Sequence, residues 1–304
     1  MKFGQSLLVF VLAASLATGH CQSGEVIADN HHALLPMAAD DKHPQERQLQ
    51  TSGTWSALGG PVYGNAASDL LGRARDISSD GTTIVGCSAN KPCKVFTYNG
   101  SNYVRKGSKI TQPNPNDLFG NSAVRLSSNG QRIAVGAPFA DTGGFNNNGC
   151  VYVYDFDGTT WQLTVSHCGG ASNAYIGWTL AMSADGNTIA GAGAANNNRA
   201  EFFKYKDGAW SKQVLTGGTS FGESVALNAA GDMLAVGEMN YNSNQGQVHT
   251  YRHDGTTWNS IGVVIGGFGI AANFGSDVPL ATVGSTTTMI VGALLGNIGG
   301  SDRG

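Results

Sequence analysis

Charged residues are scarce in this sequence: Asp, Glu, Lys and Arg make up 13% of its 304 residues, about half the share usual for a globular protein. The formal net charge is −3, and no cluster of Lys and Arg occurs that would hold nucleic acid or a membrane surface. Beyond the first twenty residues no long apolar run occurs, so no membrane span is expected in the mature chain.

Motifs of the common enzyme classes are also missing. The sequence has no P-loop, no dinucleotide-binding glycine motif and no His-Glu-x-x-His pair. After residue 50 the histidines are His167, His249 and His253, and none lies in a nucleophile motif. Asp and Glu are too few and too scattered for the sequence to pair two carboxylates for glycoside hydrolysis. The sequence therefore predicts no specific enzyme activity and no cofactor.

The N-terminus has the pattern of a secretory signal peptide. Lys2 precedes an apolar run from Leu7 to Leu16, and small residues follow, with cleavage expected after Gly19 or Cys21. Residues 1–21 are therefore predicted to direct secretion, and an uncleaved signal anchor is the alternative. Residues 22–50 are charged and contain few aromatics, which predicts a disordered linker or propeptide. Within it, His31-His32 is either a metal-binding pair or part of a solvated tail.

Residues 51–304 repeat a pattern that begins with an apolar residue followed by Gly, and the repeats are 45–57 residues apart. Each such pair is followed nine residues later by a turn glycine, except in the second repeat, where the spacing of ten predicts a bulge. The initial pairs are Leu71-Gly72, Phe119-Gly120, Ile176-Gly177, Phe221-Gly222 and Phe274-Gly275.

Each repeat predicts four short strands. Alternating residues before the turn glycine and an apolar run after it predict a hairpin, and the Asp-Gly or Asn-Gly pair at its tip predicts a two-residue turn. A third strand rich in Val and aromatics ends at another glycine, and a fourth strand begins with Tyr or Trp.

A four-strand unit of this kind leaves two edges and one face uncovered, so tandem copies are expected to pack face to face around an axis. The fold class predicted is all-β: a β-propeller of about five four-stranded antiparallel blades. Thr54-Trp55 resembles an isolated fourth strand and is expected to complete the last blade. The alternative is an incomplete or truncated propeller.

Four cysteines remain after the signal peptide: Cys87, Cys93, Cys150 and Cys168. No C-x-x-C occurs, which argues against a zinc site, and an even number suits an oxidising compartment. In the predicted layout, the end of one strand lies beside the start of the next. The pairs 87–93 and 150–168 are therefore expected to form disulfides, whereas the other pairings would join different blades.

Two segments resemble the halves of FG-GAP repeats: Phe221-Gly222-Glu223-Ser224-Val225, and the Gly136-Ala137-Pro138 end of the second strand in the second repeat. FG-GAP repeats form the propeller of integrin α chains, and the resemblance covers about residues 51–295. Sialidase Asp boxes and WD repeats are poorer matches, because Asp157-Gly158 lacks the spacer of an Asp box and the repeats exceed WD length.

Integrin-type repeats often carry calcium in the loop between strands one and two, and this sequence departs from them there. That loop is short here, and calcium needs six to eight oxygen ligands. Asp80 and Asp185 are interpreted as turn formers, so calcium is not expected. Asp155-Phe156-Asp157-Gly158 lies at another turn, which either binds an ion weakly or is simply solvated.

The loops between strands two and three are the longest and are rich in Asn, which both donates and accepts hydrogen bonds. We expect them to share one face and to bind an extracellular protein or a glycan, although Asn also suits exposed loops for its backbone alone. The candidate residues are Phe145, Asn146, Asn147, Asn148, Asn196, Asn197, Asn198, Asn240 and Tyr241.

The expected function is thus a secreted, non-catalytic recognition or adhesion module. The alternatives are a carbohydrate-active or other hydrolytic propeller, and a structural part of a longer secreted protein. Asn99-Gly100-Ser101 is a glycosylation sequon, placed at a turn between the third and fourth strands.

Overall fold

The computed structural model describes residues 8–12, 58–64, 70–88, 91–111, 113–114, 117–193, 198–266, 272–283 and 286–294. Within these ranges the chain forms nineteen strands and one irregular helical turn, α1 (Tyr241–Asn244). The all-β prediction is therefore confirmed.

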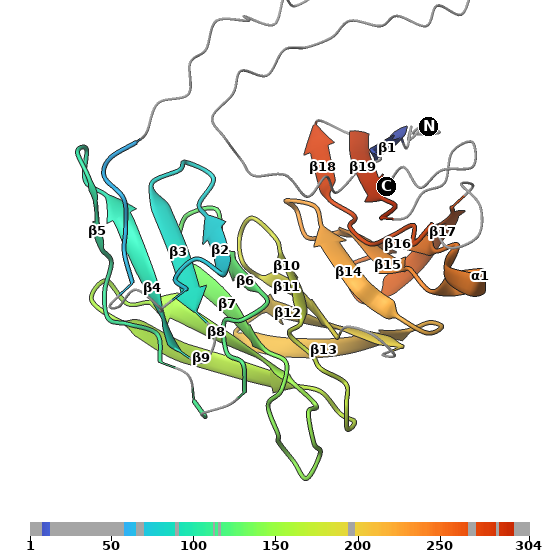
Figure 1. The fold of residues 1–304 in the computed structure, drawn as a ribbon, viewed down its shortest axis with the longest axis horizontal. Helices are drawn as coiled ribbons and strands as arrows, with labels where there is room; N and C mark the ends of the chain where they lie inside the picture. The colour runs from blue at the N-terminus through green and yellow to red at the C-terminus, as the bar shows by residue number, and fades with distance from the viewer. Residues whose placement is uncertain are drawn as a thin grey trace, which may run out of the picture. The chain divides into compact units, whose positions relative to one another are not determined.

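Four sheets follow one another along the chain, each a meander of four antiparallel strands in sequence order (Figure 1). Sheet 1 comprises β2 (Ala74–Ile77), β3 (Thr83–Ser88), β4 (Lys91–Tyr98) and β5 (Tyr103–Arg105). Sheet 2 comprises β6 (Val124–Leu126), β7 (Arg132–Ala137), β8 (Cys150–Phe156) and β9 (Trp161–Cys168). Sheet 3 comprises β10 (Thr179–Met182), β11 (Thr188–Ala192), β12 (Arg199–Lys206) and β13 (Ala209–Thr216). Sheet 4 comprises β14 (Phe221–Leu227), β15 (Met233–Glu238), β16 (Gln247–His253) and β17 (Trp258–Ile265).

A fifth sheet holds the antiparallel hairpin of β18 (Leu280–Val283) and β19 (Thr286–Gly292), with β1 (Leu8–Leu12) parallel to β19. The predicted four whole blades and a partial fifth are thus present. Thr54-Trp55, expected to complete the fifth, lies outside the described residues, as do residues 22–50 and most of residues 1–21. Among the described strands, β18 and β19 make no extensive contact with β2–β5, so closure of a ring is not seen.

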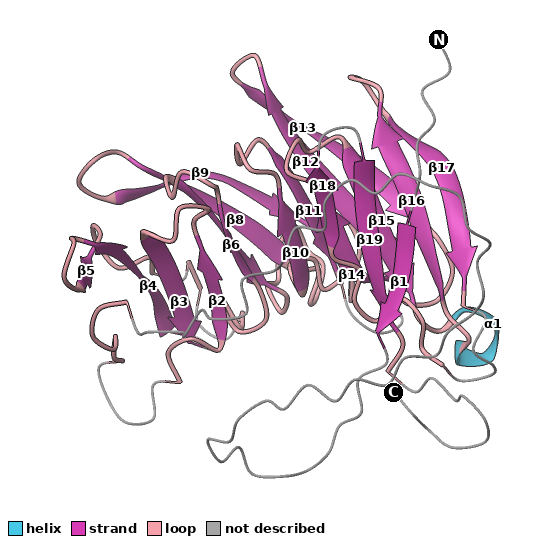
Figure 2. Cartoon of the chain, turned by 90° about the horizontal axis from the view of Figure 1, so that it is seen from above, coloured by secondary structure: helices cyan, strands magenta, loops and turns pink. Residues whose placement is uncertain are grey.

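The first strands of neighbouring sheets lie beside one another: β2 contacts β6, β6 contacts β10, and β10 contacts β14. Figure 2 shows the sheets following one another as separate layers. Alternate side chains of each strand enter different cores, as period-two patterning requires. In β7, for example, Val135 packs in the core toward sheet 1, whereas Ala134 packs in the core toward sheet 3.

The apolar–Gly pairs that open each unit share one backbone conformation. The glycine has positive φ in all five, from 65° at Gly120 to 99° at Gly222. The residue before the apolar member also has positive φ, for example Leu70 at 50° and Ser220 at 66°. This left-handed region costs least for glycine, which explains its recurrence.

The glycines also allow neighbouring sheets to approach closely. A Cβ added at Gly136 in β7 would lie 1.9 Å from the Gly177 carbonyl oxygen of the next unit. A Cβ at Gly237 in β15 would lie 2.0 Å from the Gly275 carbonyl oxygen. Each opening glycine therefore packs against the second strand of the preceding sheet, where a side chain has no room.

The turns between strands one and two are wider than predicted. In sheet 1 the Ser78 N–H donates to the Thr83 carbonyl (2.9 Å), so four residues rather than two form the connection. The Asp80 carboxylate holds this wider turn, because it accepts from Ser78 Oγ (2.6 Å) and the Thr82 N–H (2.9 Å). Asp185 makes the equivalent bonds in sheet 3, so both aspartates are turn formers as predicted.

The predicted bulge in the second unit is wrong. Pairing between β6 and β7 is continuous, and the extra residue lies before β6 instead. A bulge occurs in the fourth unit, between Phe221 and Ser224. Residues ahead of a strand absorb an insertion without breaking the ladder, which is why spacing alone misplaced it.

These turns are linked from sheet to sheet by backbone hydrogen bonds. The Ser79 N–H donates to the Ser128 carbonyl (3.1 Å), and the Ser128 N–H donates to the Ala184 carbonyl (2.8 Å). The Ala184 N–H then donates to the Ala229 carbonyl (2.8 Å). One ladder thus joins sheets 1 to 4 at their turn ends.

Both predicted disulfides are confirmed. Cys87 is bonded to Cys93 across β3 and β4, and Cys150 is bonded to Cys168 across β8 and β9. Each bond joins neighbouring antiparallel strands, as the layout required. This pairing suits an oxidising compartment.

Candidate functional site

The loop between β7 and β8 (residues 138–149) and the connection between β9 and β10 (residues 169–178) lie side by side. Three backbone bonds join them: Asn173 N–H to the Asn146 carbonyl (2.8 Å), Tyr175 N–H to the Asn147 carbonyl (3.0 Å) and Ile176 N–H to the Asn148 carbonyl (3.1 Å). We call this pair of segments the loop pair. It gives sheet 2 a structured surface at the end opposite its hairpin turn.

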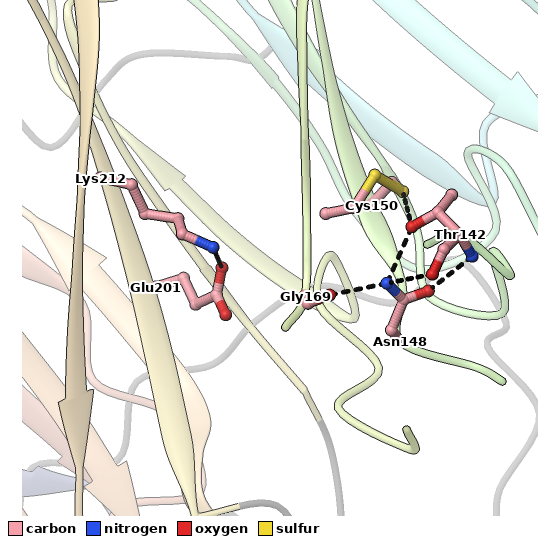
Figure 3. Close-up of a disulfide and its surroundings, with 7 residues drawn as sticks. Thr142, Asn148, Cys150, Gly169, Glu201 and Lys212 are labelled. Atoms are coloured by element: carbon pink, nitrogen blue, oxygen red, sulfur yellow. Dashed lines mark hydrogen bonds and ion pairs between the residues drawn. A yellow bond between two sulfur atoms is a disulfide. The ribbon is translucent and has the colours of Figure 1, made fainter. Parts of the chain in front are cut away.

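Asn148 is the centre of the loop pair, as Figure 3 shows. Its side chain is buried, its Oδ1 accepts from the Thr142 N–H (3.0 Å), and its Nδ2 donates to Thr142 Oγ1 (2.8 Å) and the Gly169 carbonyl (2.6 Å). Thr142 Oγ1 in turn lies 4.0 Å from Cys150 Sγ of the disulfide. The amide of Asn148 thus shapes the loop from within, and the solvent-facing positions are its neighbours.

The candidates Phe145 and Asn146 are exposed, and Asn147 is half-buried with φ 48°. The Asn147 N–H donates to Asp141 Oδ1 (2.6 Å), and its amide lies 3.5 Å from Asn173 Oδ1. Tyr175 also donates its hydroxyl to Asn173 Oδ1 (3.3 Å). Amide and hydroxyl groups are therefore fixed in position at the surface.

An aromatic group lies beside these amides. The ring of Phe139 is 5.4 Å from that of Tyr175 and 6.2 Å from that of Trp178, and all three side chains are partly exposed. With Phe145, which is 39% exposed, this gives the loop pair four accessible rings. Aromatic faces next to amides are the usual composition of a surface that binds sugar rings or protein.

The remaining candidates lie in the third and fourth units. Asn198 is exposed, whereas Asn196 and Asn197 lie outside the described residues. Asn240 donates to Ser220 Oγ (2.7 Å), and Tyr241 is 37% exposed. The structure therefore brings Phe145 to Asn148 together in one loop, and it places Asn198, Asn240 and Tyr241 on other units.

A buried ion-pair group lies between sheets 2 and 3. Glu201 is fully buried, with Oε1 3.2 Å from Arg199 Nη2 and Oε2 3.2 Å from Lys212 Nζ (Figure 3). His167 stacks on Phe203 with a ring separation of 4.0 Å. Burial, with help from the charge of Lys212, lowers the pKa of His167 to about 4, so its ring is neutral at pH 7.

Polar atoms of this group retain unused hydrogen-bonding capacity. Among the described residues, six buried side-chain polar atoms have no hydrogen-bond partner, and four belong here: His167 Nε2, Arg199 Nε, Glu201 Oε1 and Trp210 Nε1. Such a concentration is uncommon inside a protein. It marks this part of the sheet 2–sheet 3 boundary as the most polar interior of the described chain.

One carboxyl near the loop pair has a shifted pKa. Burial raises the pKa of Asp117, a hydrogen bond from Asn114 opposes the shift, and the nearby charge of Asp141 adds to it. Asp117 Oδ2 is another of the buried atoms without a partner among the described residues. Two carboxyls therefore influence each other close to Phe139, whose N–H donates to the Asp117 carbonyl (3.2 Å).

The histidine of the fourth unit is part of a polar cluster rather than a lone strand-face residue. His249 Nε2 lies 2.6 Å from Oε2 of the buried Glu238, and Gln247 Nε2 donates to the same oxygen (2.8 Å). The ring of His249 also meets Phe221 edge to face. The pair bridges β15 and β16 and is largely shielded from solvent.

The two turns between strands three and four named in the sequence are self-contained. Asp155 pairs with Arg132 (2.6 Å), and Asp157 accepts from the N–H groups of Thr159 (2.8 Å) and Thr160 (2.7 Å). These hydrogen bonds hold the pKa of Asp157 well below its usual range. Asn99 has the same role, because its Oδ1 accepts from the N–H groups of Ser101 and Asn102 at an exposed turn.

Sequence reasoning missed three of the aromatic residues and the buried carboxylates. Phe139, Tyr175 and Trp178 are separated by up to 39 positions, so only the fold brings them together. Gln245 was also missed, although it precedes Gly246 just as Asn148 precedes Gly149. Its amide donates to the Gly266 carbonyl, as that of Asn148 does to Gly169, so comparing the repeats would have found it.

No known protein family matches the sequence, and no curated protein matches it either. Within the described residues, no group of three or more His, Cys, Asp or Glu side chains is arranged to hold a metal ion. The same part of the chain contains no helix long and apolar enough to cross a membrane.

Proposed function

We propose that the chain is a secreted recognition module that binds a glycan or an extracellular protein through the loop pair of sheet 2. The observation that carries the proposal is the group of accessible rings, Phe139, Phe145, Tyr175 and Trp178, beside fixed amides. Aromatic rings supply contact area at a low entropic cost, and amides supply directed hydrogen bonds. The resemblance of the repeats to FG-GAP units, which recur in secreted adhesion proteins, supports the same function.

The rigidity of the loop pair supports it further. Asn148 and the Cys150–Cys168 disulfide hold the two segments together, so little ordering is required when a ligand binds. A surface already held in its bound conformation keeps more of its contact energy as affinity.

The test is a binding screen of the purified secreted chain against a glycan array and a panel of extracellular proteins. For any ligand found, we expect Tyr175→Ala to weaken binding by about tenfold or more, as loss of an interface anchor does. The double variant Phe145→Ala/Asn146→Ala tests the outer part of the same surface. Leu163→Ala is the matched control, because Leu163 is exposed on β9 away from the loop pair.

Thermal unfolding of each variant separates lost binding from lost folding. If the loop-pair variants stay folded and bind with unchanged affinity, the loop pair is not the binding surface. If Tyr241→Ala alone abolishes binding, the surface lies on the fourth unit instead.

A hydrolytic activity is the second candidate, and the coupled carboxyls Asp117 and Asp141 favour it. A carboxyl with a raised pKa beside an ionised partner is the arrangement of a general acid and its companion in glycosidases. A screen with chromogenic glycosides tests it: turnover that disappears in Asp117→Asn and in Asp141→Asn would favour an enzyme. Absence of turnover with every substrate that binds would leave the recognition function.

A further inference from the structure

The outer face of sheet 1 is an uncovered copy of a surface that is buried elsewhere in the chain. Cross-strand register makes the pair Ile84 and Phe96 equivalent to Ile133 and Tyr154 in sheet 2 and to Leu234 and Tyr251 in sheet 4. In sheets 2 and 4 these residues pack against the preceding sheet. In sheet 1 they line an apolar groove of about 440 Å³, together with Ile77, which is 54% exposed.

The outer face of the fifth sheet is uncovered as well. A groove of about 280 Å³ is lined there by Pro279, Ile290 and Leu294, and Ile290 is 41% exposed. Ile290 neighbours Met289 and Val291, which point the other way into the core shared with sheet 4. Ile290 is therefore on the side that, in sheets 1 to 4, packs against the following sheet.

The glycines at the two ends form separated halves of a recurring contact. Inside the chain, Gly136 of one sheet receives Gly177 of the next, and Gly237 receives Gly275. Gly292 has the position of Gly136 and Gly237, because its carbonyl accepts from Gly275 N–H as that of Gly136 accepts from Gly120 N–H. Among the described residues, only Ser276 and Asp277 of its own unit approach the site of a Cβ at Gly292, and nothing lies within 4 Å at Gly72.

The charges at the two ends are of opposite sign. Arg75 is exposed next to Ile77 in the groove of sheet 1, and Arg105 lies over the ring of Phe96, 5.2 Å from its centre. In the groove of the fifth sheet the charged residue is Asp277, which is exposed. Association of the two faces would bring arginines toward an aspartate around an apolar centre.

We infer that the chain associates head to tail with a second copy of itself, with the fifth sheet of one molecule packing on sheet 1 of another. What fits the groove of sheet 1 is the trailing face of a sheet of this same repeat, and the fifth sheet presents such a face uncovered. The contact is heterologous, since its two halves are different surfaces, so each molecule keeps one free half after pairing. Assembly therefore continues to longer chains or closed rings rather than stopping at a symmetric dimer. The inference is independent of the loop pair and of its ligand.

The first experiment is sedimentation velocity of the purified secreted chain over a wide range of concentration. We expect reversible association beyond the dimer for the native sequence. Ile77→Asp and Ile290→Asp each place a charge in one of the two faces, and each is expected to weaken association by about tenfold or more. Ile261→Asp is the matched control, because Ile261 is an equally exposed isoleucine on β17, away from both faces.

A mixing experiment identifies the geometry. Ile77→Asp retains an intact fifth-sheet face, and Ile290→Asp retains an intact sheet 1 face, so an equimolar mixture should form a one-to-one dimer although neither variant associates alone. A symmetric interface predicts no such rescue.

Three results would overturn the inference: a native chain that is monomeric at every concentration, association that Ile77→Asp leaves unchanged, or a mixture of the two variants that stays monomeric. Because all substituted residues are exposed, near-native thermal unfolding is expected for each variant and confirms that folding is intact. A monomeric native chain in which both isoleucines are protected from solvent would indicate closure within one molecule instead.

Discussion

Gly136 is the position where a single methyl group has least room, because the Gly177 carbonyl oxygen lies 1.9 Å from the site of its Cβ. We expect Gly136→Ala to lower the free energy of unfolding by about 2–3 kcal/mol, since two backbones would have to separate. Chemical denaturation measures this change.

Gly86→Ala is the matched control for this prediction. Gly86 also lies in a second strand, but its added Cβ would meet only flexible Leu71 side-chain atoms and the Gly72 nitrogen at 3.4–3.5 Å. We expect a change of about 0.5 kcal/mol or less. Equal losses in the two variants would show that glycine is needed for backbone conformation and not for space.

His167 makes stability depend on pH in a defined window. Its pKa is about 4 in the folded protein and near 6.5 in an unfolded chain, so the unfolded state binds more protons between these values. The contribution of His167 is fully present above pH 6.5 and is lost as the pH falls toward 4. We expect the free energy of unfolding to decrease over that range.

The variant His167→Phe isolates this effect, because a phenyl ring can keep the stack on Phe203 without a proton to gain. The native chain should lose more stability than the variant when denaturation is measured at pH 5 instead of pH 7. His253, whose pKa is lowered chiefly by burial, contributes equally to both proteins. Parallel losses would mean that the ring of His167 is not shielded from solvent.

At the scale of elements, the two disulfides differ in the length of chain they close. Cys87 and Cys93 are six residues apart, whereas Cys150 and Cys168 are eighteen apart. A longer closed loop restricts the unfolded chain more, which corresponds to about 2 kcal/mol for the first bond and about 3 kcal/mol for the second. Replacing both cysteines of a pair by serine and measuring denaturation midpoints tests the order.

The second disulfide also supports the loop pair, so its removal should affect ligand binding as well as stability. Removing Cys87–Cys93 provides the comparison, because that bond lies in sheet 1. A greater stability loss from the shorter loop would show that packing against Gly120, whose added Cβ would lie 2.6 Å from Cys87 Cβ, outweighs loop length.

Strands and disulfides were predictable because their signals are local. Alternation in segments such as residues 224–227, together with a turn glycine, defines a hairpin from neighbours in sequence. The exact turn was not predictable, since Asp80 bonds to Ser78 and Thr82 and so stabilises a wider connection than the Asp-Gly pair suggests. The candidate site was predictable only in part: Asn147 and Asn148 are adjacent in sequence, whereas Phe139 and Trp178 meet through pairing of distant segments.

At the scale of the whole molecule, the described part of the chain is a series of like sheets, each contacting its neighbours. Energy in such a series is close to a sum of sheet stabilities and of nearest-neighbour interfaces. The sequence predicted the series from its repeats, but closure depends on how each small rotation between sheets accumulates. No local pattern encodes that sum, so the repeats alone do not determine whether the series closes into a ring.

The ladder of backbone bonds from Ser79 through Ser128 and Ala184 to Ala229 uses the same kind of donor and acceptor at every step. Because main-chain atoms make these bonds, the step does not depend on which side chains a given unit carries. Duplication or loss of one whole repeat in the gene would therefore rejoin the ladder without a new interface having to evolve. We expect copy number to vary among natural relatives of this chain, in multiples of one unit, while the turn glycines are retained in each copy.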